Sequence, residues 1–310
     1  MKIIALFLFS AFPVYFMVPS PARAQGQWLA RAPMTSTRTE VAVVELGGKI
    51  YVIGGFGQGG DLVEEYDPAR DRWRRRASLP RPLHHSGAAA LAGRIYVIGG
   101  YVSGVGAVDT VYEYDPASDQ WRAVSPMPTA RGALAVGVVG EKIFAVGGVG
   151  KDDRNSAANE EYEPAKERWT KRASLPTPRD HLAIGVAGGK LYAVGGRIDG
   201  RHAKNLTVNE EYDPLADRWR PSAPMPTARS GIAATALAGR IFVFGGESPS
   251  GTFNQTESYD PSTNSWTAWS PMPTARHGLG AAVVGKSIYV LSGGPEPGGT
   301  FSSANEVFTP

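Results

Sequence analysis

The chain has 310 residues, with 32 lysines and arginines against 29 aspartates and glutamates, a formal net charge of +3, and no cysteine. The lack of cysteine excludes a disulfide framework, and the nearly balanced charge gives no electrostatic case for binding nucleic acid or an anionic membrane surface. The 38 glycines and 24 prolines, together with the lack of a long helical periodicity, favour an all-β fold.

The first 24 residues are predicted to be a secretory signal peptide. Lys2 provides a positive start, residues 3–18 form an uncharged apolar run, and residues 22–24 (Ala-Arg-Ala) resemble a cleavage signal. An uncleaved membrane anchor is the alternative, but the run is shorter than the roughly 20 residues of a spanning helix and Pro13 interrupts it. We therefore expect one mature domain over residues 25–310, exported as a monomer to a bacterial periplasm or the exterior, with no stable membrane anchor.

The rest of the sequence is a sixfold repeat. Each copy carries a tryptophan and, ten residues later, a position that is arginine in all copies but one. The tryptophans are Trp28, Trp73, Trp121, Trp169, Trp219 and Trp266, and the matched positions are Arg38, Leu83, Arg131, Arg179, Arg229 and Arg276. A glycine pair follows after sixteen residues, and then a tyrosine that stands seven residues before the next tryptophan. In the sixth copy these elements become Ser292 with Gly293, and Phe308. The fixed period indicates a repeat architecture.

Each repeat is predicted to form four strands, here called a to d from the axis outward. Strand a is the run of small and β-branched residues after the arginine position, predicted at residues 41–44, 87–91, 134–139, 182–186, 232–236 and 279–284. Strand b ends at the glycine pair, strand c ends at the tyrosine, and strand d carries the tryptophan. Four strands in about 48 residues, repeated radially, predict a β-propeller with six blades.

The two ends of the chain predict how the ring closes. The chain begins with a lone strand d at Trp28 and ends after a strand c at Phe308. The N-terminal strand is therefore expected to complete the sixth blade and to leave no open sheet edge.

The spacing of the arginine, the glycine pair, the tyrosine and the tryptophan closely resembles the kelch repeat. The resemblance covers residues 27–310 and implies an all-β, six-bladed propeller of four-stranded kelch blades. It implies much less about function, because kelch propellers include both enzymes and binding modules.

Strand direction predicts which face carries function. Strand a leaves the d–a loop and strand b returns, so the d–a and b–c loops are expected to share one face. The interval from the glycine pair to the aromatic residue is also the only one that varies in length, and binding residues favour variable loops on rigid scaffolds. The candidate ligand-binding residues on this face are Arg38, His84, His85, Arg131, Arg179, His181, Arg197, Arg229, Glu247, Arg276 and His277.

Two interpretations of the repeated arginines remain open. Either they hydrogen-bond loop carbonyls as structural residues, or they present guanidinium groups to the carboxylates of a ligand. A glutamate that stands two residues before most of the tyrosines (or Phe308) is interpreted as structural, because it repeats with the blade. These glutamates are Glu64, Glu160, Glu210, Glu257 and Glu306.

Four of the five histidines lie just after the arginine position, at His84, His85, His181 and His277. They are expected to contact a ligand or to form a solvated rim. No metal site is expected, because histidines on blades a third of a turn apart are predicted to lie too far apart. If these histidines titrate near pH 6.5, acidification adds positive charge and favours an anionic ligand.

No arrangement of residues in the sequence supports catalysis. The lack of cysteine excludes the tyrosine–cysteine cross-link of galactose-oxidase-like propellers, and the glutamate, aspartate and histidine of iron-dependent plant specifier proteins, spaced four residues apart, do not occur. The exported N-acetylneuraminate mutarotases pair a glutamate just after a glycine pair with an arginine six residues on. Glu247 matches that glutamate, but Phe253 stands at the arginine position.

The sequence therefore predicts a non-enzymatic recognition module without a cofactor or metal. Its expected ligand is a protein, peptide or carbohydrate that carries negative charge. The alternative is a sugar-modifying enzyme that resembles the mutarotases.

Overall fold

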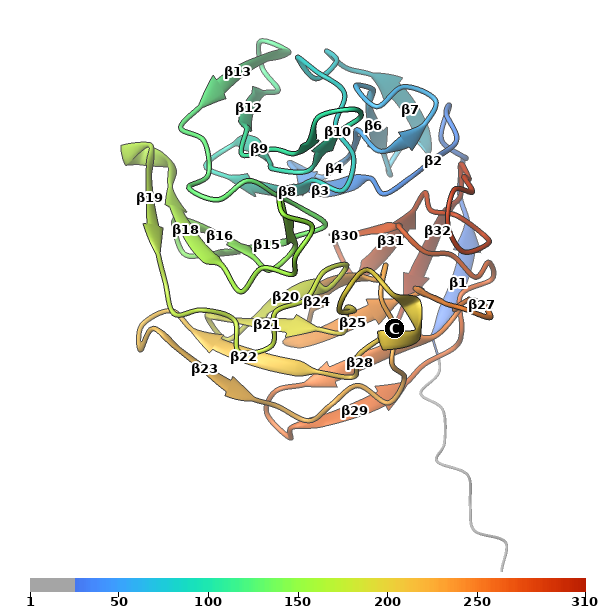
Figure 1. Cartoon of the computed structure of the whole chain (residues 1–310). Coiled ribbons are helices and arrows are strands. Elements are labelled where there is room, and N and C mark those ends of the chain that lie inside the picture. Colours follow the sequence, from blue (N-terminus) through green and yellow to red (C-terminus); the bar gives the residue numbers. More distant parts are fainter. Residues whose placement is uncertain (1–25) are drawn as a thin grey trace, which may run out of the picture.

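The computed structural model describes residues 26–310, which form six four-stranded antiparallel sheets arranged around a central axis (Figure 1). The predicted signal peptide lies outside these residues. Each sheet runs from strand a beside the axis to strand d at the rim, as predicted. The expectation of an all-β, six-bladed propeller is therefore confirmed.

The first three blades follow one another along the chain. From axis to rim, blade one contains β3 (Ala42–Leu46), β4 (Lys49–Ile53), β6 (Val63–Asp67) and β7 (Arg72–Arg75). Blade two contains β8 (Gly87–Leu91), β9 (Arg94–Ile98), β12 (Val111–Asp115) and β13 (Gln120–Val124). Blade three contains β15 (Ala135–Val139), β16 (Lys142–Val146), β18 (Asn159–Glu163) and β19 (Arg168–Lys171).

The last three blades repeat the same order. Blade four contains β20 (Ala183–Ala187), β21 (Lys190–Val194), β22 (Asn209–Asp213) and β23 (Arg218–Pro221). Blade five contains β24 (Ala233–Leu237), β25 (Arg240–Phe244), β28 (Thr256–Asp260) and β29 (Ser265–Ala268). Blade six contains β30 (Gly280–Val284), β31 (Ser287–Leu291), β32 (Asn305–Thr309) and β1 (Gln27–Ala30).

In the described part of the chain, four pairs of two-residue strands lie outside the blades. Two pairs connect a d–a segment to a b–c loop, and two lie within a single b–c loop. They are β2 (Arg38–Thr39) with β5 (Phe56–Gly57), β10 (Tyr101–Val102) with β11 (Gly106–Ala107), β14 (Arg131–Gly132) with β17 (Val149–Gly150), and β26 (Glu247–Ser248) with β27 (Gly251–Thr252). Two short 3-10 helices complete the elements, η1 (Pro164–Lys166) and η2 (His202–Lys204). Within residues 26–310, no helix has the length and apolar character needed to cross a membrane.

The sixth blade is closed by the N-terminal strand, as predicted. β1 pairs antiparallel with β32 along its whole length, and Trp28 lies opposite Phe308. The Trp28 and Phe308 rings also pack against each other, with centroids 4.9 Å apart. The two ends of the chain thus share one sheet, which leaves no unpaired inner strand in the ring.

The hydrophobic core lies between the blades rather than within one sheet. Ile53 and Val63 of blade one, for example, belong to the same buried cluster as Ile95 and Val97 of blade two. Strand b is covered on both faces by neighbouring blades, and its last four residues are buried in every blade. This explains why strand b is a continuous apolar run, because a strand buried on both faces has no solvent side.

The repeated tryptophans fasten each blade to the one before it. The indole Nε1 of Trp73 donates to the carbonyl of Ala32, and that of Trp121 donates to the carbonyl of Ala77, each over 2.8 Å. Each of the remaining four indoles makes the same contact across a blade boundary. A buried indole N–H needs a hydrogen-bond partner, and here the partner always belongs to the neighbouring blade.

The glycine pair marks a close approach between blades, as the sequence predicts. Gly147 has φ of +67°, and a Cβ atom there would lie 2.8 Å from the carbonyl oxygen of Arg179 in the next blade. Only glycine combines this left-handed conformation with the absence of a side chain.

The five repeated arginines are fully buried, and each pairs with the repeated glutamate of its own blade. The closest nitrogen–oxygen distances are 2.7 Å for Arg38–Glu64, 2.8 Å for Arg131–Glu160, 2.5 Å for Arg179–Glu210, 2.5 Å for Arg229–Glu257 and 2.6 Å for Arg276–Glu306. The guanidinium groups also donate to backbone carbonyls, such as that of Gly147, which accepts from Arg131 over 2.7 Å. Each arginine therefore ties the d–a loop to the end of strand b and to strand c.

Blade two lacks both members of this pair. Leu83 stands at the arginine position and Tyr112 at the glutamate position, and both belong to one buried hydrophobic cluster. The two replacements belong together physically, because a buried charge without its partner is strongly destabilising whereas an apolar pair of similar volume is tolerated.

This difference predicts what happens when the leucine and tyrosine of blade two replace Arg131 and Glu160 in blade three. Arg131→Leu alone leaves Glu160 buried without its guanidinium, so we expect a loss of about 3–5 kcal/mol in the free energy of unfolding. The double variant Arg131→Leu/Glu160→Tyr removes both charges, so less than half of that loss is expected. Chemical denaturation of both variants measures the difference.

The exposed pair Arg122–Glu113 provides the control, because Arg122 is 55% exposed and its nitrogen lies 2.7 Å from the glutamate. Arg122→Leu is expected to change stability by less than about 1 kcal/mol. Equal losses in the single and double variants of blade three would contradict the pairing argument.

Candidate functional site

A closed ring of backbone hydrogen bonds surrounds the axis at one mouth of the propeller. Its members, the second residues after the arginine position, are Glu40, His85, Ala133, His181, Gly231 and Gly278. Each N–H donates to the carbonyl of the ring residue in the preceding blade over 2.7–3.0 Å, and Glu40 closes the ring by donating to Gly278. All six have φ between +51° and +64°, a strained conformation for any residue but glycine.

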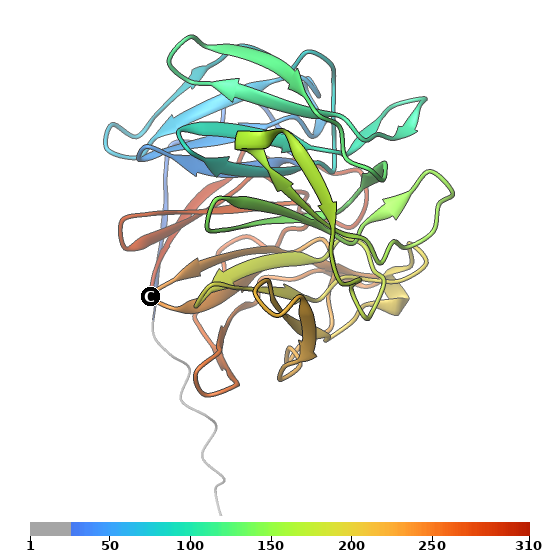
Figure 2. The ribbon, with the colours of Figure 1, turned by 90° about the vertical axis from the view of Figure 1, so that its left-hand side faces the viewer.

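The b–c loops lie on the same face as this ring, as predicted. In every blade a d–a residue bridges to a residue of the b–c loop, for example His84 to Tyr101 and Asp180 to Arg197. Figure 2 shows the b–c loops extending from the face opposite the C-terminus. The ring and the loops of variable length thus form one mouth.

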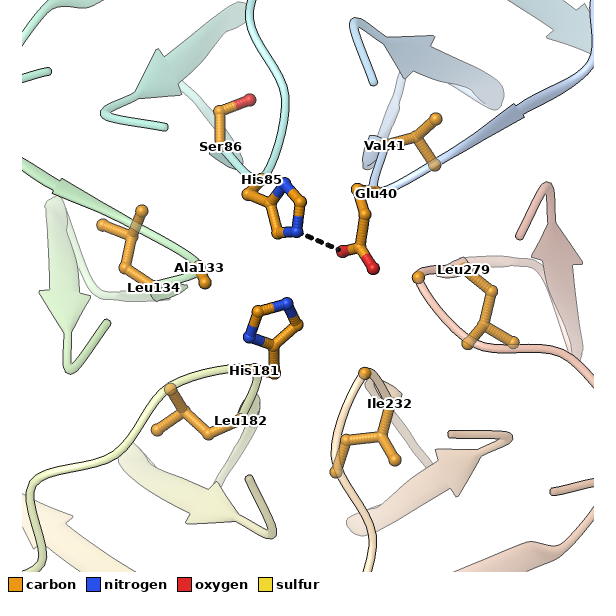
Figure 3. A pocket seen from close by; sticks show the side chains of 12 residues that line it. Glu40, Val41, His85, Ser86, Ala133, Leu134, His181, Leu182, Ile232 and Leu279 are labelled. Carbon is orange, nitrogen blue, oxygen red and sulfur yellow. Dashed lines mark ion pairs between the residues drawn. The ribbon is translucent and has the colours of Figure 1, made fainter. Parts of the chain in front are cut away.

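Three of the six ring residues carry functional side chains, and three are small. Glu40, His85 and His181 point toward one another across the axis (Figure 3). Ala133 and two glycines leave room beside them, so a cavity of about 100 Å³ opens at the axis. Below the ring this cavity is lined mainly by apolar residues, namely Val41, Leu134, Leu182, Ile232 and Leu279.

The expectation that histidines of blades two and four lie too far apart to meet is wrong. The rings of His85 and His181 have centroids only 5.0 Å apart. The reason is their backbone conformation: the ring of hydrogen bonds holds both residues in the left-handed region, which turns their side chains inward over the axis rather than outward along the rim.

A charged network extends outward from His181. Arg197, on the b–c loop of blade four, donates through Nε to Asp180 over 3.1 Å and through Nη1 to Glu247 over 2.9 Å. Asp180 Oδ1 also lies 2.5 Å from His181 Nδ1. Asp180, Arg197 and Glu247 are 1%, 8% and 2% exposed, so these charges interact where solvent screens them poorly.

Residues from blades four and six converge on Glu247 of blade five. The Nε2 atoms of His202 and His277 lie 3.1 and 3.6 Å from its carboxylate oxygens, and Asn205 donates to its backbone carbonyl over 2.6 Å. Its partner Arg197 comes from blade four. In the mutarotase pattern, by contrast, the arginine stands six residues after the glutamate in the same blade, where this chain has Phe253. A glutamate–arginine pair therefore exists here, built from two blades.

The pKa values around this network follow from burial and neighbouring charges. Burial alone would raise the pKa of Asp180, but the hydrogen bond from His181 and the charge of Arg197 outweigh it and hold the pKa below its ordinary value. Burial, followed by the charges of His181 and His84, drives the pKa of His85 well below its ordinary value. Near neutral pH the axis thus carries an ionised Asp180 and a neutral His85.

The opposite side of the mouth is apolar. Phe301, Phe56 and Val105 lie on the b–c loops of blades six, one and two, and are 41%, 38% and 64% exposed. Phe56 stacks on His84 with ring centroids 3.7 Å apart, and His84 lies 5.6 Å from the Tyr101 ring. We call these five residues the apolar arc.

The arc is continuous between blades six and one. A Cβ atom on Gly57 would lie 3.2 Å from the Phe301 ring, so that ring packs against β5 beside Phe56. Exposed aromatic residues gathered on one face are typical of recognition surfaces.

The structure brings some predicted site residues to the mouth and places others beneath it. His84, His85, His181, His277, Arg197 and Glu247 gather around the mouth. Arg38, Arg131, Arg179, Arg229 and Arg276 are 0% exposed and turn into their blades toward the glutamates. These contacts agree with the interpretation that the repeated arginines are structural residues that hydrogen-bond loop carbonyls.

Glu40, Asp180, Phe56 and Tyr101 also lie at the mouth, although none of them was among the predicted ligand-binding residues. Glu40 and Asp180 occupy the positions just after the arginine, which differ between blades, and that variability is the signal that marks them. Phe56 and Tyr101 directly follow the glycine pairs of blades one and two. Nothing in the sequence indicates that they meet His84.

Fold and mouth together define a propeller of short four-stranded blades, closed by its own N-terminal strand and carrying a cavity on its axis. A family model described as the KLHDC2/KLHL20/DRC7 Kelch-repeats domain matches residues 25–196 and again residues 135–308. The chain therefore belongs to the kelch-repeat family.

The solved structure of YjhT has a similar fold, with a TM-score of 0.77. The match covers 88% of this chain and 95% of that one at 16% identity, and likeness at that level concerns the fold alone. No curated protein matches the chain significantly.

The apolar arc is expected to lower the pKa of His84. Burial beneath Phe56 lowers the pKa of His84 from 6.5 to about 4, although Glu40 pulls it upward. This differs from the expectation of a charge change near pH 6.5. We expect an NMR titration to place the midpoint of His84 near 4, and Phe56→Ala to raise it toward 6.5 by admitting water.

Leu215→Ala is the control, because Leu215 is fully exposed on a c–d turn at the opposite face. It is expected to leave the His84 midpoint unchanged. A wild-type midpoint near 6.5 would show that the arc does not shield this imidazole.

Proposed function

We propose that this kelch propeller is an exported recognition module that binds a peptide segment of another protein across the mouth. The observation that carries the proposal is the apolar arc, where exposed side chains from three consecutive blades gather on the face of variable loops. Export is supported by the N-terminal pattern of a positive residue, an apolar run and a small-residue cleavage signal.

The two sides of the mouth suit two parts of such a ligand. The arc offers Phe56 and Phe301 to an apolar or aromatic side chain, and large aromatic groups contribute strongly to recognition. At the edge of the network around Arg197 and Glu247, His202 is 29% exposed and lies 3.1 Å from the Glu247 carboxylate. It offers a polar group to the ligand's backbone, and its contact with Glu247 favours one direction for that hydrogen bond.

The ligand's charge need not be negative. The prediction of an anionic ligand rested on the arginine row and its histidines. The arginine charges are paired with glutamates inside the blades, and burial lowers the pKa of His84 and His85. Arg197 at the mouth likewise faces two carboxylates. Apolar contact therefore supplies the selectivity that we propose, and salt is expected to have little effect on affinity.

Selection from a random peptide library tests this function directly. We expect the wild-type protein to enrich peptides that carry aromatic or large aliphatic residues. Truncating one central aromatic contact costs about 2 kcal/mol, so Phe56→Ala/Phe301→Ala, which removes two, should weaken binding of the enriched peptides by at least roughly 30-fold.

Leu215→Ala removes a fully exposed apolar side chain from the opposite face, and it should bind the peptides like wild type. The proposal fails if no peptide is enriched, or if the enriched peptides bind the Phe56→Ala/Phe301→Ala variant unchanged. Enrichment on a glycan array in place of peptides would replace the peptide with a carbohydrate ligand at the same face.

A second candidate, a sugar-modifying enzyme, is favoured by two contacts that the sequence did not reveal. Glu247 and Arg197 form a buried pair, and Asp180 orients His181 as in a general acid–base dyad. Both lie beside the axial cavity. The geometry supplies groups that transfer protons.

Anomer exchange of N-acetylneuraminate, followed by NMR, distinguishes this candidate from the first. We expect the protein to leave the exchange rate unchanged, because Glu247 and Arg197 are only 2% and 8% exposed and a sugar has little access to them. Acceleration that disappears in Glu247→Gln, but persists in Phe56→Ala/Phe301→Ala, would establish the enzyme and displace the recognition module.

A further inference from the structure

The side chains at the axis have the composition of a metal site. Glu40, His85 and His181 each offer one ligand atom, and these atoms lie within 4.8 Å of one another. They come from blades one, two and four, so no short motif in the sequence joins them. Two imidazoles and one carboxylate are a common ligand set for zinc and related divalent ions, with further positions left open.

We propose that Glu40, His85 and His181 bind one divalent transition-metal ion, of which Zn²⁺ is the representative, on the propeller axis. Two ligand atoms that bind one tetrahedral zinc lie about 3.3 Å apart, given zinc–ligand distances of 2.0–2.2 Å. His85 Nε2 and Glu40 Oε2 already lie 3.4 Å apart. That is too long for a good hydrogen bond and close to the spacing that a shared ion requires.

The nitrogen that His181 offers is determined by its neighbours. Asp180 faces Nδ1 at 2.5 Å, and Arg197 Nη2 lies 3.2 Å from Nε2. Because a guanidinium only donates, Nε2 is the acceptor and Nδ1 carries the proton. This is the tautomer in which a carboxylate orients a metal-binding imidazole. Metal binding displaces Arg197 Nη2 from His181, while its Nε and Nη1 keep Asp180 and Glu247.

Glu40 lacks a competing partner. Among residues 26–310 no group donates a hydrogen bond to its carboxylate, and the nearest basic nitrogens belong to His85 at 3.4 Å and His277 at 3.9 Å. A carboxylate that is only 13% exposed and unsolvated by donors gains from a cation beside it. The axial cavity of about 100 Å³ also holds an ion and a few waters, since a water occupies about 30 Å³.

The frame of the site is rigid before any ion binds. All three ligands are members of the backbone ring, so their Cα positions are fixed by six hydrogen bonds. Only side-chain rotations are needed to bring the three atoms to a common ion. A preorganised ligand set of this kind binds with little loss of conformational entropy.

Calorimetric titration of ZnCl₂ into untagged protein, freed of metal with a chelator, tests the proposal at neutral pH. We expect one ion per chain, and the NMR signals of His85 and His181 to shift while that of His202 does not. His85→Ala and His181→Ala should each weaken binding by at least about 100-fold, and Asp180→Asn by about 10-fold to 100-fold, as loss of an orienting partner does.

These alanine variants are expected to fold, because Ala133 already occupies a ring position with φ of +53°. Circular dichroism confirms their fold, and His202→Ala is the matched control that removes a nearby histidine outside the ligand set. The proposal is overturned if wild-type protein binds no zinc, if the double variant His85→Ala/His181→Ala binds it equally well, or if His202→Ala alone abolishes binding. None of these results bears on peptide binding at the apolar arc.

Discussion

The buried arginine–glutamate pair is the interaction on which the mouth depends. Taking a guanidinium out of water is costly, and burial lowers the pKa of every one of these arginines despite the adjacent glutamate. The cost is offset because each guanidinium also donates to the carbonyls that end strand b. The pair thereby fixes where the d–a loop lies relative to its own blade. Its charge is neutralised inside the fold and does not reach the mouth.

Because the arginine–glutamate pair fixes the d–a loop, the side chains that follow the arginine can differ from blade to blade. Two positions after each arginine, the backbone always enters the left-handed region and joins the axial ring, whatever the side chain. The repeat therefore keeps one frame while its chemistry varies from glycine to histidine. Blade two shows that the frame survives without the ion pair, since Leu83 and Tyr112 replace it and His85 still joins the ring.

The mouth is divided into two chemically different halves. Blades four and five contribute the network of Asp180, Arg197 and Glu247, in which each charge meets an opposite one within 3.1 Å. Blades six, one and two contribute the apolar arc. The axial cavity lies where the halves meet, and an elongated ligand that crosses the mouth contacts both. The same geometry places Glu40, His85 and His181, the metal ligands that we propose, on the axis beneath the surface that we propose for recognition.

The sequence by itself determined the blade count, the strand order, the closure by the N-terminal strand and the face that carries the variable loops. These follow from local periodicity, because a fixed spacing of arginine, glycine pair, tyrosine and tryptophan repeats one unit that can bury its faces only against its neighbours. The pairing of arginine with glutamate could also have been predicted from the sequence, because the arginine and the glutamate are replaced in the same blade, by Leu83 and Tyr112.

Only the tertiary structure decided which varied residues meet. Arg197 reaches Glu247 over 50 positions of sequence, and His85 reaches His181 from a blade two places away. No spacing rule predicts such contacts, because they depend on the radius of the ring and on the inward turn that a left-handed backbone imposes. Phe56 and Tyr101 meet His84 in the same way, because both lie on b–c loops, whose lengths differ between blades and whose course is set by packing against their neighbours.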